Sequence, residues 1–211
     1  MHPSPPEGRA QSHPRLNVAG NQNSFDTDFF DTMTTSLISA LHANGPALDR
    51  ADKLSLYGWL IGDWKMDVVV FGPDDRKYEG RGEIHFGWVL EGRAIQDVWI
   101  LPGIFHGTTL RVYDPGIDAW HIVWSDPLKQ YYSRQIGRAQ GKDIVQIGKN
   151  DAGKTTRWSF RDIAPDAFRW LGEVSGDDGR SWALEAEFRA RRVGAPAQVH
   201  PVQGTRVAGD R

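Results

Sequence analysis

Short stretches in which apolar and polar residues alternate follow one another along most of this chain, from Gly62 onward. Six of the nine tryptophans lie in such stretches. Alternation with a period of two is typical of strands that bury one face. The pattern predicts strands at residues 63–71, 78–89, 92–101, 107–114, 118–125, 129–138, 142–148, 155–163, 166–174 and 180–191.

Turn-forming residues separate these predicted strands, as in Gly72-Pro73-Asp74-Asp75 and Asp114-Pro115-Gly116. Such short connections join consecutive strands in an antiparallel meander. About ten strands of this kind can close into one barrel, which removes the exposed edges of the sheet. The sequence therefore predicts an all-β fold, an up-and-down antiparallel β-barrel of about ten strands.

Two short helical patterns precede the first strand. Met33, Leu37, Ile38 and Leu41 form one apolar stripe, and residues 46–59 form a second pattern that begins with a proline. We expect one or two short helices here, within a single domain at residues 29–193. The Pro-, Gly- and Asn-rich segments 1–28 and 194–211 are expected to be disordered tails.

Composition limits the chemistry that this chain can perform. Among 211 residues there is no cysteine, which excludes disulfides, thiolate metal sites and cysteine nucleophiles. The net charge of −2 has no block of like charge, so neither nucleic acid nor a membrane surface is an expected partner. The sequence also lacks a long apolar run and the pattern of a signal peptide. We expect a soluble, cytoplasmic protein.

The first and last predicted strands carry a recognisable pair of motifs. The first begins with Gly62-Asp63-Trp64, and the last ends with Arg189-Ala190-Arg191-Arg192. This pair resembles the calycin superfamily, which includes lipocalins, fatty-acid-binding proteins and nitrobindin-type barrels. The resemblance implies that Trp64 plugs the closed end of the barrel and that Arg192 lies across its ring.

Three further segments are similar to an uncharacterised bacterial group of calycin-like proteins: Leu90–Asp97, Arg111–Pro115 and Glu173–Gly179. The resemblance covers about residues 55–192. Nitrobindin-type barrels that bind haem use a histidine late in the chain, but no histidine lies between His121 and His200. We therefore expect neither haem nor another cofactor.

The resemblance and the strand alternation together predict which side chains point into the barrel. If Trp64 points inward, so do most of the large rings. They form either a packed core or the wall of a cavity for an apolar or aromatic ligand, and a ten-strand barrel is wide enough for a cavity. The candidate ligand-binding residues are Trp99, Trp120, Trp124, Tyr131, Trp158, Phe160, Trp170 and Trp182.

Asp97 and Arg134 are the candidates for catalysis. Asp97 shares a strand face with Trp99, so it points into the barrel if that tryptophan does, where burial would make it a candidate general base. The alternative, which we favour, is that Asp97 faces outward or pairs with Arg93 or Arg134. Arg134 and Tyr132 share a face and either bind an oxyanion or form an exposed strand surface.

A metal site is not expected. His85 lies near Glu83 on the predicted outer face, His106 lies in a loop, and His121 alternates with inward tryptophans. The histidines do not have the spacing of metal ligands.

Three functions remain after these exclusions. The first is a soluble protein that binds an apolar or aromatic small molecule. The second is a cofactor-independent isomerase, cyclase or lyase with Asp97 as base and with Arg134 and Tyr132 stabilising an oxyanion. The third is a filled barrel with a structural role, and a homodimer is one option for its assembly.

Overall fold

Ten antiparallel strands account for most of the chain that the computed structural model describes, which is residues 36–72 and 76–194. Every predicted strand is present, and its ends differ from the prediction by at most three residues. The predicted N-terminal tail and domain boundary, and the C-terminal tail beyond Gly194, lie outside the described residues. The strands are β1 (Gly62–Phe71), β2 (Lys77–Val89), β3 (Ala94–Leu101), β4 (Phe105–Asp114), β5 (Ala119–Asp126), β6 (Tyr131–Gln140), β7 (Asp143–Lys149), β8 (Thr155–Ala164), β9 (Ala167–Ser175) and β10 (Ala183–Val193).

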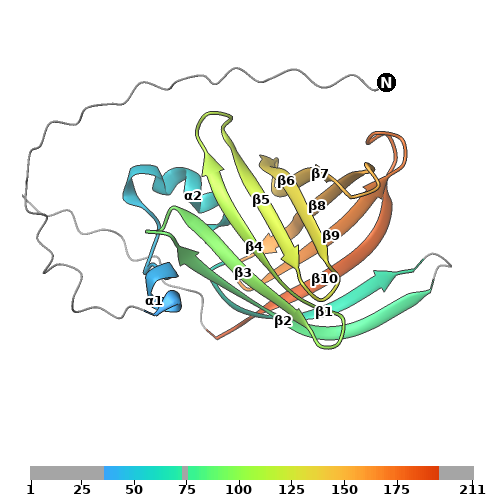
Figure 1. Ribbon diagram of the computed structural model, residues 1–211, viewed down its shortest axis with the longest axis horizontal. Helices are drawn as coiled ribbons and strands as arrows, with labels where there is room; N and C mark the ends of the chain where they lie inside the picture. Colours follow the sequence, from blue (N-terminus) through green and yellow to red (C-terminus); the bar gives the residue numbers. More distant parts are fainter. Residues whose placement is uncertain (1–35, 73–75, 195–211) are drawn as a thin grey trace, which may run out of the picture. The chain divides into compact units, whose positions relative to one another are not determined.

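The strands close into one barrel, which confirms the predicted fold class (Figure 1). Each strand pairs with its sequence neighbours, and β1 completes the ring by pairing with both β2 and β10. At the closing seam Trp64 lies between Ile84 of β2 and Arg192 of β10. Each of the ten strands therefore has a partner strand on both sides.

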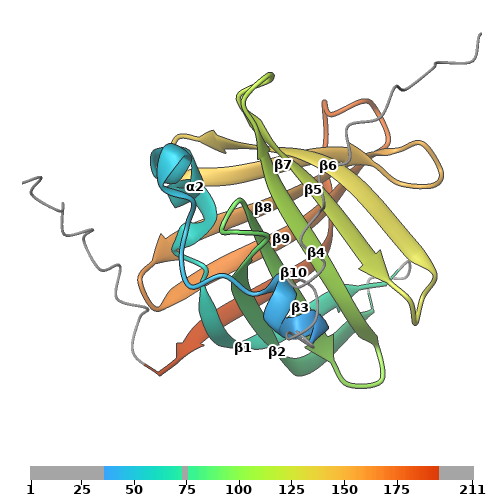
Figure 2. The ribbon, with the colours of Figure 1, turned by 60° about the vertical axis from the view of Figure 1, so that its left-hand side comes forward.

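Short helices precede the barrel, as predicted. They are α1 (Leu37–Leu41), a single 3₁₀ turn (Leu48–Arg50) and α2 (Ala51–Gly58). Leu54 and Tyr57 of α2 are fully buried. Figures 1 and 2 show α2 at one end of the barrel, and an ion pair of 2.8 Å between Lys53 and Asp118 ties it to the turn between β4 and β5.

The meander gives the barrel two different ends. Strand β1 starts at the end that α2 covers, so the turns after β1, β3, β5, β7 and β9 all lie at the opposite end. We call these the closed end and the open end. This arrangement leaves the open end lined by turns, whereas the closed end has a helix packed against it.

The strand alternation correctly predicts the inward faces of β1 and β2. Trp64, Met66 and Val68 are buried on β1, as are Ile84 and Phe86 on β2. The residues between them on the two strands are mostly exposed. These inward residues belong to one continuous core with α2.

Arg192 and Trp64 form the centre of the closed end. The Arg192 guanidinium carbon lies 4.1 Å from the centre of the Trp64 ring. Its nitrogens donate hydrogen bonds to the backbone oxygens of Trp59, Ile61 and Pro165, at 2.5–2.9 Å. The Trp64 indole N–H in turn donates to the oxygen of Leu60 at 2.7 Å. Arg192 therefore links the helix end, the first strand and the turn between β8 and β9.

Gly62 makes room for this contact. Its φ of +118° lies in a region that other residues rarely adopt. A Cβ atom there would lie 3.0 Å from Nη1 of Arg192. The glycine of the Gly-x-Trp motif is thus required both by the backbone conformation and by the approach of the arginine.

Truncating Trp64 to alanine is expected to lower the free energy of unfolding by about 3–5 kcal/mol, as for other large buried rings. Arg192→Lys keeps the charge but cannot donate all three hydrogen bonds to the backbone oxygens. It should lower the free energy of unfolding by about 1–3 kcal/mol. Chemical denaturation would measure both changes. The control is Arg191→Lys, on the next residue, whose side chain is 77% exposed. A loss below about 1 kcal/mol for Trp64→Ala would contradict this account of closure.

Candidate functional site

A cavity of about 480 Å³ lies inside the barrel, toward the open end. It is bounded by residues near the ends of strands that meet there, including Val70 of β1, Ile104 before β4 and Tyr131 of β6. The volume is in the range of small-molecule pockets, about 300–1,000 Å³. The barrel is therefore not filled by its own side chains.

Aromatic rings form a large part of the cavity wall, with eight among its seventeen lining residues. Trp170 stacks on Phe188 with ring centres 4.7 Å apart, and Phe188 stacks on Phe105 at 6.0 Å. Trp99 and Trp158 each lie within 6 Å of Trp170, at 5.8 and 5.7 Å. These rings support one another, so the wall is preformed without a ligand.

Five of the eight predicted ligand-binding residues line this cavity: Trp99, Trp124, Tyr131, Trp158 and Trp170. Trp120 and Phe160 do not. Both are buried at the closed end, where they pack against Tyr57 with ring centres 4.8 and 6.1 Å away. They pack with Tyr57 of α2 at the closed end and do not line the cavity.

The prediction for Trp182 is wrong. Strand β10 begins only at Ala183, and its pairing with β9 is irregular between Leu184 and Ala186. The strand alternation therefore does not extend to Trp182. Its ring lies 4.1 Å from the Arg157 guanidinium, which pairs with Glu173 on the outer face of β8 and β9.

The floor of the cavity holds a buried ion pair. Arg111 of β4 lines the cavity and donates from Nη1 to Oδ2 of Asp97 on β3. The other Asp97 oxygen accepts from the backbone N–H of Thr109 at 2.8 Å. Both side chains are at most 2% exposed. The Arg111 guanidinium also lies 5.5–5.8 Å from the rings of Phe86, Tyr57 and Phe160.

This geometry corrects our interpretation of Asp97. The carboxylate points inward with Trp99, so the outward orientation that we favoured is wrong, and its partner is Arg111 rather than Arg93 or Arg134. Because both of its oxygens accept hydrogen bonds and the side chain has no exposed surface, it has no access to a substrate proton.

Arg134 and Tyr132 lie on the outer face of β6. Tyr132 is 56% exposed, and Arg134 is exposed as well, whereas Tyr131, Ser133 and Gln135 alternate with them toward the inside. The alternative of an exposed strand surface is therefore the correct one. The three residues predicted for catalysis are not brought together.

Tyr57 connects the helix to a polar layer beneath the cavity. Its hydroxyl accepts a hydrogen bond of 3.0 Å from the Gln146 side-chain amide. Burial raises the pKa of Tyr57 to about 12, so the phenol is neutral. The ring enters beside Gly137, where a Cβ would lie only 2.4 Å from the hydroxyl oxygen. A glycine at this position lets α2 plug the barrel.

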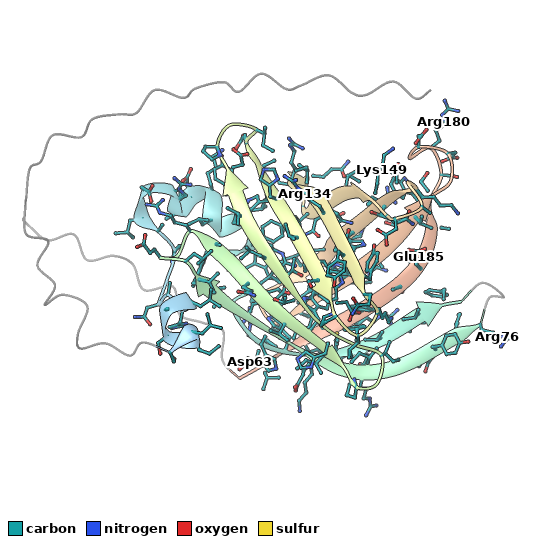
Figure 3. The ribbon with its side chains drawn as sticks, viewed as in Figure 1. Asp63, Arg76, Arg134, Lys149, Arg180 and Glu185 are labelled. Carbon is teal, nitrogen blue, oxygen red and sulfur yellow. The ribbon has the colours of Figure 1, made fainter. Side chains whose placement is uncertain are left out.

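Charged residues surround the mouth of the cavity. Asp126 is buried and accepts from the backbone N–H groups of Leu128 and Lys129, at 3.0 and 3.3 Å. Lys129 lies 5.8 Å from the centre of the Phe105 ring. Glu185 occupies the irregular position of β10, and partial burial raises the pKa of its carboxyl. Figure 3 shows Glu185 at the end away from α2.

The three histidines lie apart from this cavity. His85 contacts Asp63 at 2.7 Å on the outer face, and His121 contacts Asp114 at 3.0 Å. His106 is exposed. Among residues 36–72 and 76–194, no cluster of three carboxylate or imidazole groups is placed to hold a metal ion.

Sequence reasoning missed Arg111 and Tyr57. A signal for Arg111 was available in the hairpin of β3 and β4. Pairing about the turn at residues 102–104 sets Asp97 opposite Thr109, which places Arg111 as the diagonal neighbour of Asp97 on the same face. Tyr57 had no such signal, because a helical pattern does not show which ring enters a barrel.

Comparison with solved structures finds several similar chains. The chain is similar to the crystal structure of Rv2717c from M. tuberculosis, with 15% sequence identity, a TM-score of 0.47, and coverage of 67% of this chain and 98% of that one. No family model matches the sequence, and no curated protein does so either. In the described part of the chain, no helix is long and apolar enough to cross a membrane. The cytoplasmic location and the homodimer stay predictions.

Gly137→Ala should destabilise the protein by about 1–3 kcal/mol, because the added methyl collides with the Tyr57 hydroxyl. The cost should fall in a Tyr57→Phe background, which removes the colliding atom. Gly87→Ala, on a strand position with open space around it, is the control. Chemical unfolding of the wild type, the two single variants and the double variant gives the coupling energy between Gly137 and Tyr57. If Gly137→Ala destabilised both backgrounds equally, the proposed contact between Tyr57 and Gly137 would be refuted.

Asp97→Ala should lower the free energy of unfolding by about 3–5 kcal/mol, since it leaves the Arg111 charge buried without a partner. The double variant Asp97→Leu/Arg111→Met should be more stable than this single variant. Asp67→Ala, which breaks an exposed pair with Arg81, should cost less than about 1 kcal/mol. A double variant no more stable than Asp97→Ala would argue against a coupled pair.

Proposed function

We propose that this chain binds a small apolar or aromatic molecule in the cavity of its barrel. The observation that carries the proposal is a space of about 480 Å³ within a closed sheet, with eight aromatic residues among the seventeen that line it. A barrel with a purely structural role would be expected to fill this space, because empty cavities destabilise a core. The cavity therefore favours a binding role over a filled barrel.

The composition of the wall favours a ligand with aromatic rings. Trp99, Trp158, Trp170 and Phe188 present ring faces and edges at several orientations around the space. Flat ligands can stack on such faces or contact them edge to face, each pair contributing about 0.5–1.5 kcal/mol beyond the buried area. A purely aliphatic ligand would not gain this contribution.

The residues on which the enzymatic alternative depends do not meet in the cavity. It required an accessible Asp97 together with Arg134 and Tyr132 facing the same space. Asp97 is bonded to Arg111 and Thr109, and the other two side chains lie outside the barrel. Binding without chemistry is the simpler use of the cavity.

The calycin-like assignment belongs to the same proposal. The packing of Arg192 on Trp64 at the closed end, with an open cavity at the other, supports it. We place this binding protein in the cytoplasm, and assembly into homodimers remains one option.

The proposal predicts that a neutral fluorescent aromatic molecule, N-phenyl-1-naphthylamine, binds one site per chain. Ala186→Phe, which extends a ring into the cavity from a lining position, should weaken binding by at least about tenfold, or 1.4 kcal/mol. Fluorescence titration measures the affinity, and circular dichroism verifies the fold.

Val123→Phe is the matched control, because it adds a ring at an exposed position of β5. It should leave the affinity unchanged. Native mass spectrometry of the purified protein adds an independent readout. A small molecule that copurifies with the wild type should be displaced by the dye and should be absent from Ala186→Phe. Equal dye binding by both phenylalanine variants would place the dye elsewhere and refute the cavity as the site.

A further inference from the structure

We infer that the cavity selects uncharged aromatic ligands that bring a hydrogen-bond acceptor to its floor, and that it discriminates against carboxylates and other anions. This inference rests on the proposed function and adds the charge and polarity of the ligand. Three features of the cavity support it.

The first feature is that the arginine of the floor already has its counterion. Arg111 is the only cation of the floor among the described lining residues, and Asp97 contacts it directly. Both side chains are almost fully buried, so their charges act in a medium of low polarity. A ligand carboxylate at Arg111 would face the Asp97 carboxylate at close range, and like charges in one dehydrated site repel strongly.

The second feature is the balance of charge in the whole cavity. The described residues that line it carry two cations, Arg111 and Lys129, and two carboxylates, Asp126 and Glu185. Asp97, behind Arg111, makes three carboxylates. Partial burial raises the pKa of Glu185, and if that group is protonated the charges are equal in number. In neither state does the cavity carry the net positive charge that would attract an anion.

The third feature is the kind of polar atom left without a partner. Among the described residues that line the cavity, two have a buried side-chain atom with no hydrogen bond: Trp99 at Nε1 and Arg111 at Nε. Both atoms are N–H donors, and neither side chain can accept a hydrogen bond. A ligand that brings an acceptor to these atoms, such as a carbonyl oxygen or a ring nitrogen, supplies the partner that they lack in the protein. A ligand without acceptors does not.

Three naphthalenes of similar size separate charge from hydrogen bonding: 1-naphthamide, 1-naphthoate and 1-methylnaphthalene. Each would be titrated by displacement of N-phenyl-1-naphthylamine. We expect 1-naphthamide to bind most tightly, by at least about tenfold over 1-naphthoate, which corresponds to about 1.4 kcal/mol. It should also bind more tightly than 1-methylnaphthalene, which has no acceptor.

Asp97→Asn tests the cause of this order. The substitution removes the counterion and leaves Arg111 as an uncompensated cation, so the affinity ratio of naphthoate to naphthamide should rise by at least about tenfold. Glu173→Gln is the matched control. It also removes a carboxylate from an arginine pair, but on the outer face. It changes the net charge equally and should leave the ratio unchanged.

The outcomes separate the two proposals. If the dye and all three naphthalenes fail to bind, the binding function itself is refuted. If 1-naphthoate binds as tightly as 1-naphthamide and Ala186→Phe blocks both, the binding function stands and the inference about charge is overturned. An equal change of ratio in Asp97→Asn and Glu173→Gln would also overturn it. Should Asp97→Asn fail to fold, the order of affinities in the wild type decides the inference.

Discussion

The contact between Arg192 and the closed end is the constraint on which the rest of this structure depends. Arg192 lies near the end of the last strand, and its guanidinium reaches backbone oxygens at the end of α2, at the start of β1 and in the turn before β9. These groups come together only when the last strand has paired with the first. The arginine therefore stabilises closure of the ring and the position of the helix at once. With the helix fixed at one end, any free volume must lie toward the other.

Aromatic residues have different roles at the closed end and at the open end of the barrel. Near α2, Trp64, Trp120 and Phe160 are fully buried, with Trp120 and Phe160 against Tyr57 and Trp64 against Trp59 at the end of the helix. Toward the open end, Trp158 and Trp170 have no helix opposite them and enclose a cavity instead. What distinguishes the two groups is therefore their distance from the plug rather than their chemistry. The cavity remains because one short helix fills only one end of an interior that ten strands make too wide for their own side chains.

The fold could be predicted from the sequence because strand alternation and turn residues are local signals. The roles of individual side chains depended on features that are not local. Strand β6 alternates Tyr131 and Ser133 with Tyr132 and Arg134, and neither set is apolar enough to identify the buried face. Trp182 precedes a strand whose register is irregular, so counting by two assigned it to the wrong side. The role of Tyr57 depends on how α2 packs against the barrel, and the periodicity of the helix does not determine this packing.

The ion pair of Asp97 and Arg111 occupies the boundary between these two halves, and its position bears on function. Removing two charges from water costs several kcal/mol for each ion, and well-packed apolar residues in their place are often as stable or more so. Stability alone therefore gives little reason for a buried pair between aromatic layers. A role in recognition gives a better one, because an arginine whose charge is neutralised still offers directional donors to a bound molecule. Asp97 then determines what Arg111 can bind: it occupies the place of a ligand carboxylate and leaves the remaining donors for a neutral acceptor.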